Sequence, residues 1–384
     1  MQFDFSTTQR IIFGWGALDK LPSIISKFGT RAFLIYSKSV PAVTKIENIF
    51  NELQIKWHAF TAYGEPTDKV INQVTAEARD YNCDFVVSIG GGSVIDTGKA
   101  VSALLTNEGD LLDYLEVVGK GMPIKNLPKP YIAIPATAGT GSEVTRNAVI
   151  KITNKKVKVS MRNPWLLPSV ALVDPQLTVS VPPKITASTG MDAFTQVIEP
   201  YVSRFSNQLV DLYCKEGIEK AAKSLLKAYE YGDNQEARTN MAWVSLLGGL
   251  SLANAKLGAV HGFAGPIGGM FKAPHGTICA SLLPSVIEVN VRALREREPQ
   301  NQKVARFEEI AKIITQDSHA KIRDGIEWIK KLKDKLHIPQ LLEFNIHKRD
   351  FSEIISKSKR SSSMKGNPIT LTDGELWEIL EMAL

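Results

Sequence analysis

The first half of the chain alternates between short apolar runs and longer amphipathic stretches. The apolar runs are rich in β-branched and aromatic residues and end at turn residues; they span 31–37, 84–92, 131–137 and 169–175. Stretches with helical periodicity separate the first of them, at 41–54 and 69–82. Alternation of strands and helices predicts an α/β domain with a parallel sheet that helices cover on both faces.

The pattern changes after the pair Pro182-Pro183. From there on, long helical periodicities dominate without a convincing strand; the clearest run over 207–229, 237–255 and 307–316. A chain of 384 residues is also longer than one ordinary core requires. Because two consecutive prolines cannot lie inside a helix or a central strand, we place a domain boundary there. We expect an α/β domain over 1–182 and an all-helical domain over 183–384.

Composition and charge exclude several classes of protein. Hydrophobic residues make up 44% and charged residues 22%, as in a globular protein. The 46 basic and 40 acidic residues leave a net charge of +6, and the densest basic runs, 151–158 and 356–360, are short and lack interleaved aromatic residues. Nucleic acid is therefore not an expected partner.

Cysteine usage and the N-terminus favour a cytoplasmic protein. The three cysteines, Cys83, Cys214 and Cys279, are odd in number and far apart, which argues against a disulfide framework or a cysteine zinc site. The N-terminal sequence MQFDFSTTQR lacks the apolar core of a signal peptide. No apolar run approaches the roughly 20 residues of a membrane span, so we expect no membrane partner.

Two glycine-rich loops follow predicted strands in the first half. Gly90-Gly91-Gly92-Ser93 precedes a helix expected from about Val94, where backbone N–H groups and the helix dipole stabilise a phosphate. Glycine suits this turn because a Cβ would hold the phosphate away, and we expect positive φ angles. The run is not a GxGxxG fingerprint, and an ordinary tight turn is the alternative.

The second loop, 135–143 (PATAGTGSE), carries the hydroxyls of Thr137, Thr140 and Ser142. Taken alone, it is equally compatible with a flexible surface loop. Both loops, however, follow the C-terminal ends of strands, which is the edge where open α/β sheets bind ligands. Together they predict a nucleotide-binding site in the α/β domain.

Candidate metal ligands lie in the second half. Asp192 and Gln196 are four residues apart in a helical stretch and leave the same helix face, and Glu199 faces a similar direction. His261 and His275 bracket a turn-rich segment that can bring two imidazoles together. Carboxylate plus imidazole suits Fe²⁺ or Zn²⁺, whereas the neutral Gln196 amide is a poorer ligand. Alternatively, Gln196 hydrogen-bonds a backbone group, and Asp192 is a carboxylate near the start of a helix.

Four segments carry a resemblance to a known family. In order along the chain they are GGGSVIDTGK (90–99), PATAGTGSEVT (135–145), GMDAFTQ (190–196) and HG…PHG (261–276). They resemble the signature segments of the iron-containing alcohol dehydrogenase family. The resemblance implies an α/β dinucleotide-binding domain, an all-helical metal- and substrate-binding domain and a cleft between them. It also implies NAD(P)-dependent interconversion of a primary or secondary alcohol with its aldehyde or ketone, and a homodimer.

The resemblance also implies roles for individual residues. Asp192, His261 and His275 match three of the family's metal ligands, Gln196 replaces the fourth, a His, and Gly265 replaces a further His that some members carry. The implied catalytic residues are Asp192, His261, His275 and Lys158. The implied cofactor contacts are Ser37, Gly91, Gly92, Ser93, Asp96, Thr137, Thr140, Ser142 and Lys158, with Lys99 nearby. A bound metal is expected to polarise the substrate oxygen during hydride transfer to the nicotinamide.

Cofactor and substrate preferences are less directly encoded. Ser37-Lys38-Ser39 follows a predicted strand where NAD-preferring relatives often place an Asp, and its hydroxyls and ammonium suit the phosphate of NADP. Small and apolar residues over 254–271, including Phe263 and Met270, suggest a short or medium aliphatic substrate. Two alternatives remain open: a dehydroquinate synthase-like lyase that uses NAD transiently, and a catalytically impaired nucleotide-binding relative.

Overall fold

The computed structural model describes residues 2–115, 118–154 and 157–384, so Lys155 and Lys156 of the basic run 151–158 lie outside the described residues. The chain divides into two compact units. The α/β unit comprises Ser6–Thr137 and Gly141–Ser180, and the helical unit comprises Met1–Phe5, Ala138–Thr140 and Val181–Leu384. The short segment 138–140, which belongs to the second glycine-rich loop, thus groups with the helical unit.

A six-stranded sheet forms the centre of the α/β unit. Its strands are β1 (Arg10–Phe13), β2 (Arg31–Tyr36), β3 (Lys56–Thr61), β4 (Phe85–Gly90), β5 (Tyr131–Pro135) and β8 (Val170–Val173). They are hydrogen-bonded in the order β1-β8-β5-β4-β2-β3, and every pair is parallel. The predicted parallel sheet is confirmed.

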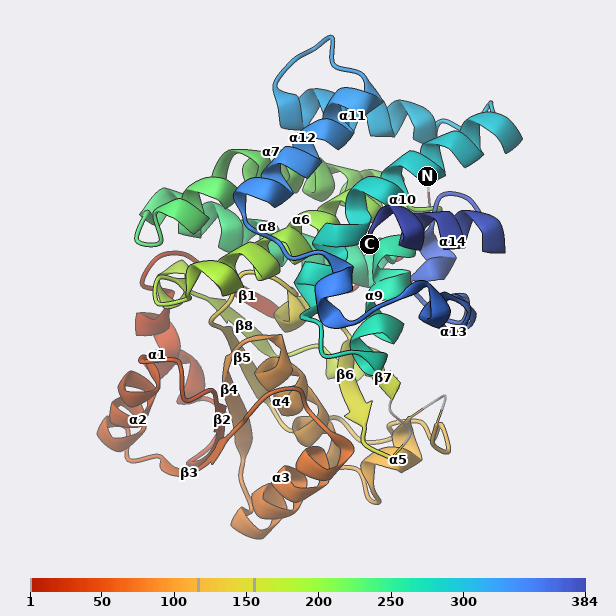
Figure 1. The fold of residues 1–384 in the computed structure, drawn as a ribbon. Helices are drawn as coiled ribbons and strands as arrows, with labels where there is room; N and C mark the ends of the chain where they lie inside the picture. The colour runs from red at the N-terminus through yellow and green to blue at the C-terminus, as the bar shows by residue number, and fades with distance from the viewer. Residues whose placement is uncertain (1, 116–117, 155–156) are drawn as a thin grey trace. The chain divides into compact units, whose positions relative to one another are not determined.

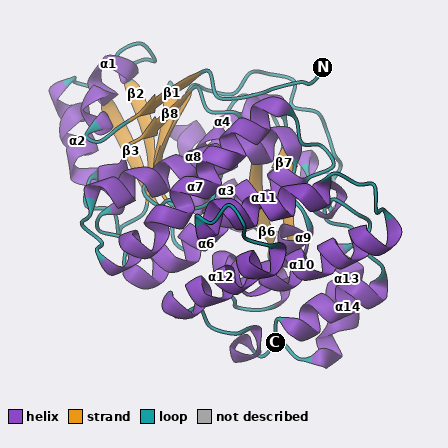
Figure 2. Cartoon of the chain, turned by 90° about the horizontal axis from the view of Figure 1, so that it is seen from above, coloured by secondary structure: helices purple, strands orange, loops and turns teal. Residues whose placement is uncertain are grey.

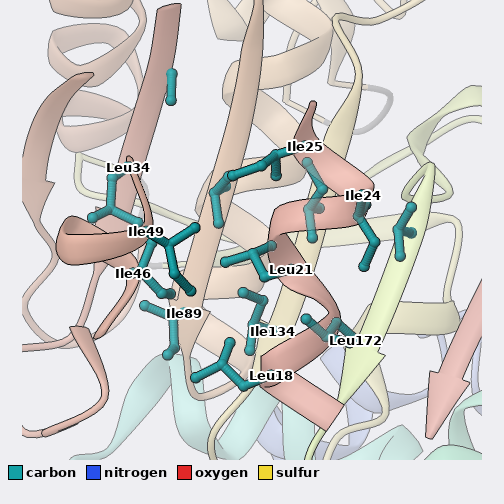
Figure 3. Packing of buried hydrophobic residues seen from close by; sticks show 14 of the residues in the cluster. Leu18, Leu21, Ile24, Ile25, Leu34, Ile46, Ile49, Ile89, Ile134 and Leu172 are labelled. Carbon is teal, nitrogen blue, oxygen red and sulfur yellow. The ribbon is translucent and has the colours of Figure 1, made fainter. Parts of the chain in front are cut away.

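Helices cover both faces of this sheet because successive side chains of each strand point to opposite faces. Leu34 of β2 packs with α1 (Leu21–Ile25) and α2 (Val43–Glu52), as Figure 3 shows for part of this core. Its neighbour Phe33 packs in a separate core with α3 (Asp68–Tyr81) and α4 (Gly92–Leu104). In Figure 1 these two helix pairs lie on opposite sides of the sheet.

Several elements of the α/β unit were not predicted from the sequence. They are β1, β3, the short helix α5 (Leu111–Tyr114) and an antiparallel pair formed by β6 (Asn147–Ile152) and β7 (Val157–Arg162). The β6–β7 pair is a separate two-stranded sheet, and Figures 1 and 2 both show it apart from the six parallel strands. Its buried residues, among them Ile150 and Met161, share a core with Leu104 of α4.

The helical unit contains no strand among its described residues, as predicted. Its helices are α6 (Pro183–Val202), α7 (Gln208–Glu230), α8 (Gln235–Ala255), α9 (Ala259–Met270), α10 (His275–Arg297), α11 (Lys303–Thr315), α12 (Ile322–Lys335), α13 (Phe351–Ser358) and α14 (Asp373–Met382). The helix α6 begins directly at Pro183, a position that favours proline because the first helical N–H has no intrahelical partner.

The helix α10 is an exception to the expectation that no apolar run is long enough to span a membrane. By length and composition it could cross a membrane, and the α8–α9 pair would do so only as a span bent by 100°. However, 89% of the apolar window of α10 is buried inside the protein. The apolar character of α10 is therefore explained by packing in the core of the helical unit.

Candidate metal centre and nucleotide-binding loops

Three helices bring the predicted metal ligands together. Asp192 lies in the middle of α6, His261 lies in the first turn of α9, and His275 is the first residue of α10. The segment between the two histidines, predicted to be rich in turns, is mostly the helix α9, with Pro266 inside it and a short turn before α10. The two imidazole rings nevertheless meet, with their centroids 5.3 Å apart.

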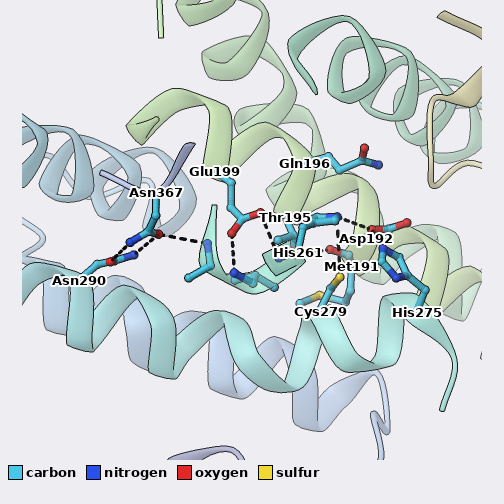
Figure 4. A network of polar contacts seen from close by, with 12 residues as sticks. Met191, Asp192, Thr195, Gln196, Glu199, His261, His275, Cys279, Asn290 and Asn367 are labelled. Atoms are coloured by element: carbon cyan, nitrogen blue, oxygen red, sulfur yellow. Dashed lines mark hydrogen bonds and ion pairs between the residues drawn. The ribbon is translucent and has the colours of Figure 1, made fainter. Parts of the chain in front are cut away.

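The reactive atoms of these side chains converge on a small volume. His261 Nε2 lies 3.1 Å from Asp192 Oδ1, and His275 Nε2 lies 3.7 Å from the same oxygen. The Sγ atom of Cys279, one turn after His275 on α10, lies 3.8 Å from His261 Nε2. One ligand atom from each of Asp192, His261, His275 and Cys279 falls within 4.8 Å of all the others, and Figure 4 shows the four side chains pointing toward one another.

Glu199 orients His261. Its Oε2 lies 2.6 Å from His261 Nδ1, and its Oε1 accepts a hydrogen bond from the backbone N–H of Val260 at 2.7 Å. Because Nδ1 is taken up by this carboxylate, Nε2 is the nitrogen that faces Asp192. A carboxylate on the outer nitrogen of a histidine is the usual support for a metal-binding imidazole.

Charge interactions in this group favour ionised side chains despite deep burial. Burial alone would raise the pKa of Asp192, but the charge of His275 and the hydrogen bond from His261 hold that pKa below its ordinary value. Burial likewise opposes a charged His261, yet the charge of Cys279 and the hydrogen bonds to Asp192 and Glu199 raise its pKa well above the ordinary value. A largely buried anionic oxygen held between two imidazoles, one of which is partly exposed, fits a divalent cation, which would replace the imidazole protons.

Gln196 is engaged elsewhere. Its Nε2 donates a hydrogen bond to the backbone oxygen of Gly139 at 2.8 Å, and its Cβ lies 3.1 Å from where a Cβ on Gly248 would be. In Figure 4 its amide stands apart from the other four side chains. This is the backbone hydrogen bond that the sequence left open as an alternative, and metal ligation by Gln196 stays a prediction.

Cys279 was missed by the sequence argument, which looked for paired cysteines and found none. The sequence did contain a signal that could have placed Cys279 in the site. His275 and Cys279 are four residues apart and therefore share one face of α10. Phe263, predicted to line the substrate site, is fully buried, and its role there stays a prediction. Met270 and Gly265, in contrast, are partly accessible, and a Cβ on Gly265 would meet nothing within 4 Å.

The first glycine-rich loop opens α4 as expected, with one correction. The helix begins at Gly92, and Gly91 is its N-cap with φ −74°, so the expected positive φ is wrong. At Gly90 the reason for glycine is space instead, whereas a Cβ on Gly91 would make only an ordinary contact. A Cβ on Gly90 would lie 2.6 Å from a methyl carbon of Val94, and a Cβ on Gly91 would lie 3.4 Å from Thr137 Oγ1. The two predicted loops therefore meet at Gly91 and Thr137, beside the free N–H groups of the α4 N-terminus.

Asp96 and Lys99, one turn further along α4, act as tethers within the α/β unit. Asp96 accepts hydrogen bonds from the hydroxyl of Ser142 and, at 2.9 Å, from the backbone N–H of Val149. The buried Lys99 ammonium donates to Thr145 Oγ1 at 2.9 Å and to the backbone oxygen of Asn147 at 2.7 Å. The bond to Ser142 fixes the second glycine-rich loop against α4, and the other three fix the segment 145–149 that follows it.

The remaining predicted cofactor residues lie apart along the chain. Ser37 follows β2, and its hydroxyl lies 2.8 Å from the hydroxyl of Ser39. Thr140 groups with the helical unit, and Ser93 lies in the first turn of α4. Lys158, predicted to be catalytic, lies on β7 and forms an ion pair with Glu65. Its roles in catalysis and in cofactor binding stay predictions.

Glu143, which closes the second loop, makes stability depend on pH. Burial raises its pKa from the ordinary 4.5 to about 7, so the folded protein keeps this proton over a range in which the unfolded chain loses it. The folded state then binds more protons, and the free energy of unfolding falls as the pH rises from about 4.5 to 7. We expect the stability of Glu143→Gln relative to the unmodified protein to rise by about 3 kcal/mol between pH 5 and pH 8.

Urea unfolding of both proteins across this pH range measures the effect, and Glu381→Gln, at an exposed position, serves as the matched control. A stability difference that stays constant with pH would contradict a buried proton on Glu143.

Comparison with known proteins identifies the family. The family model for iron-containing alcohol dehydrogenase matches residues 8–175, and the model for the C-terminal part of that family matches residues 186–384. The chain is 33% identical over 380 residues to alcohol dehydrogenase 4 of Schizosaccharomyces pombe, covering 97% of this chain and 87% of the relative. It is 34% identical over 365 residues to 1,3-propanediol dehydrogenase of Klebsiella pneumoniae, covering 92% of each.

Solved structures agree with this result. A 1,3-propanediol oxidoreductase superposes with a TM-score of 0.93 at 31% identity, covering both chains completely. Sulfoacetaldehyde reductase from Bifidobacterium kashiwanohense, solved with NAD⁺, superposes with a TM-score of 0.87 at 28% identity, covering 99% of this chain and 98% of the other. Because these relatives are dehydrogenases and reductases, the lyase alternative is not favoured. The chain belongs to the iron-containing alcohol dehydrogenase family and is a nicotinamide-dependent oxidoreductase that interconverts alcohols with aldehydes or ketones.

Proposed function

We propose that this enzyme interconverts a short or medium-length primary aliphatic alcohol and its aldehyde, with a divalent cation held by Asp192, His261 and His275. The convergence of one buried carboxylate and two imidazoles on a common point carries this proposal. Relatives named for 1,3-propanediol and methanol support the primary alcohol class.

The helical unit supplies charge and orientation at the reacting oxygen. A bound divalent cation provides Lewis acidity, which stabilises negative charge on the substrate oxygen. Asp192 contributes the anionic ligand, and Glu199 holds the His261 ring so that Nε2 faces the same point. The first turn of α10 holds His275 beside them. Burial of Asp192 and His261 shields both side chains from bulk water, which strengthens the charge interaction between them.

The α/β unit supplies the cofactor site. A nicotinamide cofactor carries the hydride, and the protein contributes binding and orientation. The N-terminus of α4, opened by Gly91 and Gly92, offers backbone N–H groups and a favourable dipole to a diphosphate. The hydroxyl of Thr137 lies beside this turn, and Ser142 is fixed near it through Asp96. We propose these residues, with Ser93 and Thr140, as cofactor contacts.

Metal content and chelator sensitivity test this function. We expect the purified protein to carry about one divalent cation per chain, and dialysis against EDTA to abolish NAD(P)H oxidation with a panel of short aldehydes. Adding Zn²⁺ or Fe²⁺ back should restore turnover. If the fully metal-free protein keeps its turnover, the proposal is wrong.

We further propose that NADP is preferred over NAD. Lys38 is exposed directly after β2, between Ser37 and Ser39, whose paired hydroxyls flank it. An ammonium and two hydroxyls suit the 2′-phosphate of NADP, and hydrogen bonds to a charged group contribute about 1.5–3 kcal/mol. We expect Lys38→Ala to lower kcat/KM for NADPH at least about tenfold while leaving kcat/KM for NADH nearly unchanged.

Steady-state kinetics with both cofactors measure this preference, with the exposed Lys45→Ala on α2 as control. A protein that already prefers NADH, as the name of the NAD-dependent methanol dehydrogenase of Bacillus methanolicus suggests for that relative, would overturn the NADP preference.

We also propose a homodimeric, cytoplasmic enzyme with a domain boundary between residues 182 and 183, a position that lies between the two family matches, 8–175 and 186–384. Light scattering on the purified protein would test the dimer, with a mass of about twice the 42.3 kDa of one chain as the expected result. A monomer at micromolar concentration would contradict this part of the proposal.

A further inference from the structure

Cys279 has no assigned role, yet it lies in the metal centre. We propose that its thiolate is the fourth protein ligand of the bound cation, so that the ligand set is Asp192, His261, His275 and Cys279 rather than one that includes Gln196. This inference rests on the proposed function, because it assumes that the centre binds a metal. The proposed fourth ligand lies on α10, whereas Gln196 lies on α6.

Three of the distances among the four side chains are close to those around a single cation, and all four ligand atoms lie within 4.8 Å of one another. Tetrahedral ligands with bonds of about 2.0–2.3 Å lie roughly 3.3–3.7 Å from one another. In this structure the separation is 3.1 Å from Asp192 Oδ1 to His261 Nε2 and 3.7 Å from the same oxygen to His275 Nε2. Cys279 Sγ lies 3.8 Å from His261 Nε2. Small side-chain adjustments would therefore complete the site.

The backbone around Cys279 is held in place independently of any ligand. Cys279 is fully buried, and it lies one helical turn after His275 on the same face of α10. The start of α10 packs directly on α6, because a Cβ on Gly276 would lie only 1.9 Å from the backbone oxygen of Ser188. This close approach brings the Cys279 thiol and the Asp192 carboxylate, which come from two different helices, to one point.

Gln196, in contrast, holds the segment 138–140 through a hydrogen bond. Its amide N–H donates to Gly139, and a Cβ on Gly139 would lie 2.8 Å from Thr189 Cβ, so this segment lies tightly against α6. Turning the amide oxygen toward a metal would give up that hydrogen bond. Gln196 thus holds the segment 138–140, and the thiol of Cys279 is the side chain left to complete the set of ligands.

A thiolate changes which metal the centre prefers. Thiolate is a softer ligand than imidazole and favours Zn²⁺ or Co²⁺ over Fe²⁺ in such a mixed site. Binding releases the thiol proton to solvent, and two anionic ligands then neutralise the charge of the cation. We therefore expect this protein to retain Zn²⁺ in preference to Fe²⁺ when both are supplied.

Cobalt spectroscopy tests the proposal without relying on activity. The chelator-stripped protein is titrated with Co²⁺, and bound cobalt is quantified by elemental analysis. We expect one Co²⁺ per chain and an intense thiolate-to-cobalt charge-transfer band in the near ultraviolet. In Cys279→Ser that band should disappear, and the affinity for Co²⁺ should fall at least about tenfold.

Cys214→Ser is the matched control, because Cys214 is equally buried on α7 but contacts Ser251, outside the centre. It should keep both the band and the affinity. If the unmodified protein binds Co²⁺ without the band, the assignment of Cys279 is wrong while the metal-dependent function stands. If it binds no Co²⁺ or Zn²⁺ at all, the proposed function fails as well. Both of these outcomes are measured on the unmodified protein, so they hold even if Cys279→Ser does not fold.

Discussion

Changing Asp192 to Asn is expected to lower kcat/KM for aldehyde reduction at least about 1000-fold, which corresponds to roughly 4 kcal/mol of lost transition-state stabilisation. The neutral amide keeps the shape of the side chain but removes the negative charge that faces both His261 and His275. Since Lewis-acid catalysis contributes several kcal/mol, loss of the anionic metal ligand should remove most of it. Metal content should fall in parallel, and both quantities are measured on the same preparation.

Asp373→Asn is the matched control for this result. Asp373 forms an exposed ion pair with Lys359 at the start of α14, and pairs of this kind contribute little. Its kcat/KM should stay within twofold of the unmodified protein. An Asp192→Asn enzyme that retains full metal and more than a tenth of the original kcat/KM would contradict the role of this carboxylate.

The second large effect is on stability and comes from Gly276. We expect Gly276→Ala to lower the free energy of unfolding by about 3 kcal/mol, because a new Cβ would lie 1.9 Å from the backbone oxygen of Ser188 and 2.6 Å from its carbonyl carbon. The obstacle is backbone of α6, so it cannot yield as a flexible side chain would. The helices must separate, and His275 moves with them. Urea unfolding measures the loss of stability, and the metal affinity measures the displacement of His275.

Gly265→Ala provides the control substitution on the neighbouring helix α9. A Cβ there meets nothing within 4 Å, and alanine is favoured over glycine inside a helix by roughly 0.5–1 kcal/mol. Gly265→Ala should therefore stabilise the protein slightly, whereas Gly276→Ala should destabilise it strongly. Equal effects at both positions would show that α6 and α10 do not approach as closely as described.

The sequence predicted those parts of the fold in which the apolar pattern is continuous. The strands β2, β4, β5 and β8 are buried along nearly their whole length, so each appears as an uninterrupted apolar run. β3 lies at the edge of the sheet and carries Lys56 and His58 between apolar residues, so its signal was weaker. Lys151 of β6 and Lys158 of β7 are the two ends of the basic run 151–158, which made the segment resemble a solvated basic run.

The site was predicted only as far as residue type and helical spacing allow. Spacing placed Asp192 and Gln196 on one face of α6, but it could not show that the Gln196 amide bonds to Gly139, since that contact depends on a segment 57 residues away. Cys279 entered the site only through the packing of α10 on α6. Likewise, the glycine at position 90 is explained by its neighbour Val94 and not by its φ angle.

Metal reconstitution of the stripped enzyme tests the central claim most directly. Protein treated with EDTA is titrated with Zn²⁺ while NADPH oxidation by a short aldehyde is followed. The structure predicts that turnover rises from near zero and saturates at one equivalent of metal per chain, and that Asp192→Asn gives no such rise. Full turnover before any metal is added, in protein shown by elemental analysis to be metal-free, would contradict a metal-assisted reaction at Asp192, His261 and His275.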